Sequence, residues 1–257
     1  MSRPALSAWI GALVLIVMFA VPVDAAVSPC AGQATSHFAG GSTSYQLNIW
    51  GSKANISDFD PALCGSSSVS VAWSMVAAVS NDAQNAHGWA QIGYGEFGGN
   101  SGFSHSGYHT FSQFTKWCYD DGSACASGYP VTKFDPAPTS TVLYKNQYRS
   151  ADSHIHMYYG STQLDETEFD PTNNHWDGNW SAQFFDETYH QETDVVGKDA
   201  NRVQYTSLMK QTDNSGGNWA GIQNITRRVD YSRYHAQFTN PTQNQNFETW
   251  TKPLNSL

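Results

Sequence analysis

Short runs of aromatic and β-branched residues recur along the chain, and clusters of Gly, Asn, Asp, Pro and Ser separate them. This alternation of apolar runs with turn residues is typical of β-strands. No long stretch keeps an i, i+3, i+4 apolar spacing, and the best helix candidate, residues 74–80, fits a buried strand equally well. Strands are predicted over residues 45–50, 68–78, 87–97, 109–117, 141–149, 154–159, 180–190, 202–209 and 219–230.

A chain of this size with this many predicted strands favours an all-β fold, an antiparallel two-sheet β-sandwich of the jelly-roll or concanavalin-like kind. The Gly- and Ser-rich residues 98–107 and the Pro-containing residues 130–138 are expected to be loops inside a domain and not linkers. No internal repeat is visible in the sequence. We therefore expect a single β-sandwich domain over residues 26–257.

The first 25 residues have the three parts of a secretory signal peptide. Arg3 supplies a positive charge, residues 8–23 are almost wholly apolar, and Val23 and Ala25 occupy the two positions that a signal peptidase inspects. The alternative is a retained membrane anchor, but the apolar run is short for a span and no stop-transfer charges follow it. We expect residues 1–25 to be cleaved, leaving a secreted protein with no membrane segment.

The charge balance excludes several classes of partner. The 257 residues include 13 Lys and Arg against 22 Asp and Glu, which gives a formal net charge of −9. An acidic protein repels phosphate groups, so nucleic acid and anionic membranes are not expected partners. Charged residues make up only 14% of the chain, a composition that suits an extracellular β-protein, including one in an acidic environment. We expect a monomer without a cofactor.

Four cysteines, Cys30, Cys64, Cys118 and Cys125, follow the predicted signal peptide. Four cysteines allow three pairings, and an exported chain can form disulfides. Cys118 and Cys125 flank a turn-like segment, so a short bridge between them is the simplest choice, and Cys30 would then pair with Cys64. A cysteine-based metal site or nucleophile is less favoured, because no CxxC spacing exists and no cysteine adjoins a histidine.

Gln91 lies in the predicted strand 87–97 within the sequence Gly-Trp-Ala-Gln-Ile-Gly-Tyr. Alternation along a strand turns Ala90, Ile92 and Tyr94 toward the core. Trp89, Gln91 and Gly93 then share the other face. A carboxamide between an aromatic residue and a glycine suits a surface that a ligand backbone approaches closely.

Glu187 lies in the predicted strand 180–190, between Phe185 and Tyr189 on one face. Aromatic neighbours partly desolvate a carboxyl group, and desolvation raises its pKa by disfavouring the charged form. Such a carboxyl group can act as general base and then as general acid in acyl transfer through water. A neutral amide opposite it, such as that of Gln91, would donate a hydrogen bond to the oxyanion of the tetrahedral intermediate.

Two segments resemble the fungal glutamic peptidases, the eqolisins. Ala-Gln-Ile-Gly-Tyr, residues 90–94, resembles the strand with a catalytic glutamine followed two residues later by glycine, and Phe-Phe-Asp-Glu, residues 184–187, resembles the strand with the catalytic glutamate. Both also resemble plant neprosin-type peptidases, whose corresponding strands read Glu-Ala-Gly-Trp and Trp-Gly-Gly-Glu-Val. A closer likeness is to uncharacterised secreted bacterial proteins with a Gln-Phe…Glu…Asp-Val-x-Gly pattern, here residues 183–197.

This resemblance covers residues 50–230 in outline and implies a β-sandwich with its active site on a concave sheet. Gln91 stands where neprosins have a glutamate, so the pair Gln91 and Glu187 matches the eqolisin arrangement instead. Carried over, Glu187 activates the attacking water and later protonates the leaving amine, while Gln91 stabilises the oxyanion. The resemblance implies a polypeptide substrate and hydrolysis that is fastest at acid pH.

Four aromatic residues are candidates for lining the substrate cleft: Trp73, Trp89, Phe185 and Tyr189. A tryptophan in a strand commonly packs in a core, and exposed aromatics suit sugar rings as well as peptides. The alternative function is therefore a non-catalytic β-sandwich that binds polysaccharide or a cell-surface partner. A peptidase requires Gln91 and Glu187 on adjacent strands of one face and within one water of each other, whereas opposite faces would favour the binding module. An inactive relative of a peptidase would show this geometry but would not cleave peptides.

Histidine pairs and an acidic run raise the question of a metal site. His154 and His156 share one strand face, and His105 and His109 lie four residues apart. A zinc site needs a third ligand and supporting hydrogen bonds, and none can be named from the sequence. The acidic residues 165–170 are expected to form a solvated loop, since their spacing fits no standard calcium loop. No metal site is predicted.

Overall fold

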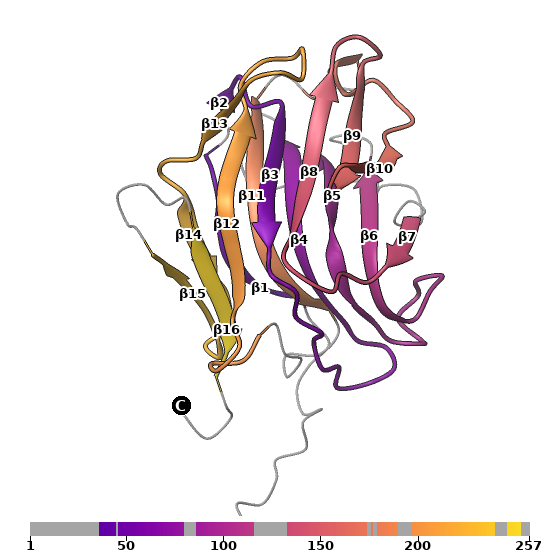
Figure 1. The fold of residues 1–257 in the computed structure, drawn as a ribbon, viewed down its shortest axis with the longest axis vertical. Helices are drawn as coiled ribbons and strands as arrows, with labels where there is room; N and C mark the ends of the chain where they lie inside the picture. The colour runs from indigo at the N-terminus through magenta and orange to yellow at the C-terminus, as the bar shows by residue number, and fades with distance from the viewer. Residues whose placement is uncertain are drawn as a thin grey trace, which may run out of the picture.

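The computed structural model describes residues 36–44, 46–79, 86–115, 133–173, 176, 179–189, 197–239 and 246–252. Their strands form two eight-stranded antiparallel sheets that pack face to face, with β3, β8 and β12 in front of β4, β5 and β11 in Figure 1. The predicted all-β sandwich is confirmed. Across these ranges the one helix is the short 3₁₀ turn Pro171–Asn173, and no helix is long and apolar enough to span a membrane.

The first sheet has the strand order β14 (Thr226–Val229), β1 (His37–Ser42), β11 (Asn179–Tyr189), β4 (Val69–Val79), β5 (Ala86–Phe97), β6 (Gly107–Thr115) and β7 (Lys133–Pro136), with β2 (Gln46–Leu47) paired to β11. The second sheet has the order β10 (Thr162–Glu166), β9 (His154–Tyr159), β8 (Val142–Arg149), β3 (Gly51–Ile56), β12 (Val203–Gln211), β16 (Phe247–Thr251) and β15 (Tyr234–Phe238), with β13 (Trp219–Gly221) paired to β12. The long central strands β4, β5 and β11 carry the segments that resemble glutamic peptidases.

Several sequence predictions need correction at the sheet edges. Residues 130–138 are not a simple loop, because Lys133–Pro136 forms edge strand β7 against β6. Proline is tolerated there because an edge strand leaves one side of its backbone unpaired. The predicted strand 219–230 is two strands in different sheets, β13 and β14. Between them Asn224 has a φ of 62°, a left-handed conformation that interrupts an extended strand.

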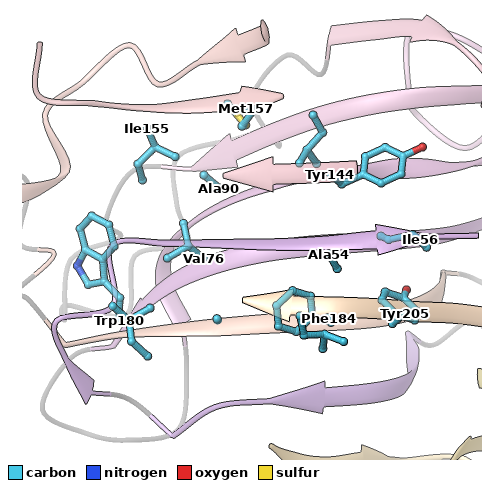
Figure 2. Close-up of a cluster of buried hydrophobic side chains, with 14 of the residues drawn as sticks. Ala54, Ile56, Val76, Ala90, Tyr144, Ile155, Met157, Trp180, Phe184 and Tyr205 are labelled. Carbon is cyan, nitrogen blue, oxygen red and sulfur yellow. The ribbon is translucent and has the colours of Figure 1, made fainter. Parts of the chain in front are cut away.

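The space between the sheets is filled by one large apolar cluster, part of which Figure 2 shows. Alternating residues of the central strands supply it, including Val76 of β4, Ile92 of β5 and Phe184 of β11, each fully buried. Residues 74–80, the helix candidate, belong to the buried strand β4 over its described length. The predicted core face of residues 90, 92 and 94 is therefore confirmed.

A small polar network crosses the middle of this core. Ser52 of β3 and Ser74 of β4 are hydrogen-bonded through their hydroxyl groups at 2.9 Å. The side-chain amide of Asn146 on β8 donates to the Ser74 carbonyl oxygen at 2.8 Å and to the Ser52 hydroxyl oxygen at 3.1 Å. These buried bonds join the two sheets and favour one relative position of β3, β4 and β8, because a shift would leave polar groups unpaired in the core.

Asp186 of β11 is a second polar contact between the sheets. Its side chain is fully buried and accepts hydrogen bonds from the Tyr205 hydroxyl group at 2.7 Å and from the Thr249 hydroxyl group. Burial raises the pKa of Asp186 to about 8, although the hydrogen bonds from Thr249 and Tyr205 act in the opposite direction. The carboxyl group is therefore protonated in the folded protein at neutral pH.

This proton predicts a stability that falls as pH rises. An unfolded chain releases the proton of an aspartic acid near pH 4, whereas the folded protein keeps that of Asp186 to about pH 8. Between these values the free energy of unfolding should decrease by up to about 1.4 kcal/mol per pH unit. Asp186→Asn keeps a neutral side chain of the same shape and should flatten this decrease. Urea unfolding at pH 5 and pH 7.5 measures it, with Glu168→Gln at an exposed carboxyl group as a control. An unchanged pH dependence in Asp186→Asn would contradict the assignment.

Candidate active site

Five of the sequence-predicted residues share the outer face of the first sheet, turned away from the second sheet. Phe185 on β11 is paired with Trp73 on β4, and Trp73 is paired with Gly93 on β5. Glu187 lies two residues from Phe185, and Gln91 and Trp89 lie two and four residues from Gly93. Alternation therefore places all of these side chains on one face.

This outer face is covered by a second apolar cluster, separate from the core between the sheets. The cluster includes Trp73 and Phe185, whose side chains are only 3% and 4% exposed and whose ring centroids lie 5.3 Å apart. Half-buried Trp89 and Phe38 pack against it. Aromatic rings thus pack beside Glu187 on this face.

Glu187 is the polar group most altered by this environment. The indole Nε1 of Trp73 donates a hydrogen bond to Glu187 Oε2 at 3.2 Å. Burial raises the pKa of Glu187 to about 7, the Trp73 hydrogen bond acts to lower it, and the negative charge of Asp230 also acts to raise it. Asp230 is positioned at this edge because its Oδ1 accepts a hydrogen bond from the Phe38 backbone N–H at 2.7 Å. A carboxyl group with this pKa changes protonation state near neutral pH.

Gln91 lies on the same face but not beside Glu187. Strand β4 separates β5 from β11, and Gln91 is level with Met75 and Gln183, whereas Glu187 is level with Val71. Two strand spacings and four residues along the strands place the two Cα atoms about 16 Å apart. The expectation of adjacent strands and a shared water is wrong, because strand order depends on pairing between distant segments and not on local sequence.

The side chain of Gln91 has a different partner. It is 8% exposed, and its Nε2 donates to Gln113 Oε1 of β6 at 2.9 Å. Gln113 is a residue that the sequence did not single out, since one glutamine among alternating apolar residues carries no motif. The two carboxamides form a polar site on the same face as Glu187, with Gln91 two strands and Gln113 three strands away from it.

The other predicted cleft residues are placed as follows. Trp73 and Phe185 are both packing residues and neighbours of the carboxyl group. Trp89 is paired with Ala77 at the far end of β5 from Phe97. The backbone of Tyr189 is paired with that of Val69, and its side chain is outside the described part of the structure. Of the four predicted cleft residues, Trp73 is the one hydrogen-bonded to Glu187, and Phe38, directly opposite Glu187 on β1, is an aromatic neighbour that the sequence did not single out.

The disulfide predictions largely fall outside the described residues. Cys64 is half-buried in the segment between β3 and β4. Its predicted partner Cys30, and both Cys118 and Cys125, lie outside the described residues. The pairing stays a prediction.

Two features raised by the metal question have other roles. Asp165 is buried on β10 and not part of a solvated loop: it accepts a hydrogen bond from Ser112 at 2.9 Å and pairs with Lys133 at 2.5 Å. His156 is buried, with its Nε2 2.9 Å from Asp152 Oδ2. Within the described ranges no three His, Cys, Asp or Glu side chains gather as a metal site would require.

Comparison with solved structures places this fold. A scytalidoglutamic peptidase bound to a peptide-based transition-state analogue aligns over 85% of this chain and 99% of its own, with a TM-score of 0.50 and 11% identity. SCP-B, an eqolisin-family peptidase in complex with the tripeptide Ala-Ile-His, aligns equally well. The chain has a glutamic-peptidase-like fold.

This likeness concerns the fold alone, since the identity is only 11%. No protein-family model matches the sequence, and no curated protein matches it. A κ-carrageenase from Pseudoalteromonas carrageenovora aligns with a TM-score of 0.36 over 84% of this chain and 79% of its own, at 8% identity, too weakly to support any argument. Activity has to be inferred from the residues of the site.

The hydrogen bond between Trp73 and Glu187 can be tested without any substrate. Trp73→Phe removes a donor to the charged form of the carboxyl group, so the pKa of Glu187 should rise by about one unit. Carbon-13 NMR of glutamate-labelled protein measures this titration, and Glu187→Gln identifies the signal by its loss. Trp89→Phe, on the same face but away from Glu187, should leave the pKa unchanged. An equal shift in both variants would mean that aromatic packing, and not the hydrogen bond, controls Glu187.

Proposed function

We propose that the protein is an exported hydrolase of peptide bonds that uses Glu187 to transfer protons. The observation that carries the proposal is the carboxyl group itself: it is desolvated, bonded to Trp73, and has a pKa of about 7. It also lies on a central strand of a fold shared with glutamic peptidases. Export rests on residues 1–25, which are outside the described ranges.

The proposed reaction needs one proton carrier. The Glu187 carboxylate takes a proton from a water as its oxygen attacks the carbonyl carbon of the peptide bond. The protonated Glu187 then gives this proton to the leaving amine as the C–N bond breaks. Trp73 orients the carboxyl group through its hydrogen bond, and Phe185 excludes water from one side.

A polypeptide substrate is supported indirectly. The two eqolisin structures hold a peptide-based transition-state analogue and a tripeptide, respectively. In this protein the aromatic surface around Glu187 would accept apolar side chains of a peptide. An extended peptide of about five residues is long enough to reach from Glu187 to Gln91.

This geometry changes the role proposed for Gln91. Its carboxamide is too far from Glu187 to donate a hydrogen bond to the same tetrahedral intermediate. We propose that Gln91, with Gln113, binds the peptide several residues from the cleaved bond. Gln91 is therefore not assigned the role of oxyanion donor.

The pKa also changes the pH dependence expected from the family resemblance. With a pKa of about 7, about one Glu187 in a thousand is ionised at pH 4. The general base would therefore be scarce at acid pH. The rate is expected to be greatest near neutral pH and not at pH 3 to 5.

The activity test compares the protein without residues 1–25 with its Glu187→Gln variant on casein. The variant should lose about 100- to 10 000-fold in kcat, as expected for removal of a general base. In the unaltered protein kcat/KM should rise with pH to a plateau, with a midpoint near 7, because the carboxylate is the active form. Activity equal in both proteins, or absent from both between pH 3 and pH 9, would refute the proposal and favour the non-catalytic module.

A second comparison separates the two residues of the predicted pair. Gln91→Ala should raise KM while leaving kcat within about fivefold, since Gln91 is proposed to bind substrate and not the transition state. Gln91→Glu should likewise leave substantial activity. A loss of kcat in Gln91→Ala as large as that in Glu187→Gln would show that the two side chains act together and that our separation of them is wrong.

A further inference from the structure

The outer face of the second sheet, on the opposite side of the sandwich from Glu187, carries a concentrated positive charge. Lys53 on β3 is directly opposite Lys145 on β8. Arg149 lies on the same face of β8, four residues further along the strand. Three cations on two adjacent strands are unusual in a chain with 13 Lys and Arg and a net charge of −9.

This arrangement costs stability unless something offsets it. Like charges directly opposite each other in a sheet repel. Burial lowers the pKa of Lys53. Burial also lowers the pKa of Lys145, and the nearby positive charges of Arg149 and Lys53 lower it further. Among the described residues, no ion pair joins these three cations to a carboxylate.

The nearby carboxylates belong to a different group. His156 is on the neighbouring strand β9. Asp152 Oδ2 lies 2.9 Å from its Nε2, and Glu166 Oε2 lies 3.3 Å from its Nδ1. They therefore surround the histidine and not the three cations. Asp152 and Glu166 act on Tyr158 together with Arg149, but within the described residues neither carboxylate is directly paired with one of the three cations.

Aromatic rings hold the cations in position. Lys53 Nζ lies 4.4 Å from the ring centroid of Trp219, and Lys145 Nζ lies 3.8 Å from that of Tyr158. A guanidinium N–H of Arg149 donates to the Tyr158 hydroxyl group. Cation–π contacts stabilise a cation without neutralising its charge, so the three side chains are ordered and still able to attract an anion.

We propose that this face, defined by Lys53, Lys145, Arg149 and Trp219, binds an anionic polysaccharide such as a polyuronate. The carboxylates of the polymer would pair with the three cations, and half-buried Trp219 would stack on a sugar ring. The flat aromatic surface beside the charges favours a sugar polymer over an acidic peptide. At about 0.1 M salt the overall negative charge does not prevent binding, because carboxylates more than about 10 Å away are largely screened.

This binding function is independent of the proposed hydrolysis. The two surfaces lie on opposite faces of the sandwich, so a polymer held at one would leave the Glu187 face open. An anchored hydrolase would act close to the matrix to which it is bound. The test below measures binding only and gives the same answer whether or not the protein cleaves peptides.

The experiment measures binding of polygalacturonate by calorimetry at about 20 mM and about 200 mM salt, where screening differs strongly. The double variant Lys53→Gln/Lys145→Gln should bind about tenfold more weakly or worse, through loss of two charge-assisted contacts. The control Lys198→Gln/Arg228→Gln removes the same charge at two exposed residues elsewhere and should bind as the unaltered protein does. Binding should weaken at the higher salt concentration.

Two further measurements make the result decisive. The Lys53→Gln/Lys145→Gln variant should unfold at the same temperature as the unaltered protein or higher, because it relieves a repulsion. Trp219→Ala should weaken binding of polygalacturonate but not of poly-glutamate. The proposal is overturned if the unaltered protein binds no polygalacturonate, if both double variants bind alike, if neutral dextran binds equally well, or if poly-glutamate binds more tightly.

Discussion

The pairing of β4 with β11 on one side and β5 on the other is the constraint on which the rest of the structure depends. It runs for ten residues on β11, from Trp180 to Tyr189, and decides which face each side chain occupies. A slip of one residue would turn Glu187 into the core and Asp186 onto the outer face. The core bonds of Asp186 to Tyr205 and Thr249 oppose such a slip, because it would leave three buried polar groups without partners.

Asp186 and Glu187 show how one strand produces two different carboxyl groups. Both have a raised pKa, and burial is the largest cause for each. Asp186 is enclosed between the sheets, where its proton stabilises the fold. Glu187 stays partly accessible on the outer face, where the same physical effect prepares it to exchange protons with a substrate. The neighbouring residue thus secures the position of the group that we propose to be catalytic.

The two outer faces of the sandwich differ in chemistry. The first sheet presents aromatic rings, two carboxamides and one desolvated carboxyl group, a combination that suits an uncharged polymer such as a peptide. The second sheet presents ordered cations held by Trp219 and Tyr158, a combination that suits a polyanion. A sandwich with eight strands in each sheet can carry both surfaces because its core lies between the sheets and leaves both outer faces available.

The sequence by itself determined the local properties of this protein. Alternation identified the long central strands β4, β5 and β11 and the core face of residues 90, 92 and 94, because a period of two depends only on residues close together in the chain. The prediction of a strand over residues 45–50 was wrong, since strand β3 begins only at Gly51. Only the tertiary structure decided which strands lie side by side. It placed β4 between Gln91 and Glu187, brought Lys53 opposite Lys145, and assigned residues 219–221 and 226–229 to different sheets. Strand order arises from contacts between distant segments, and a period of two along each strand carries no information about it.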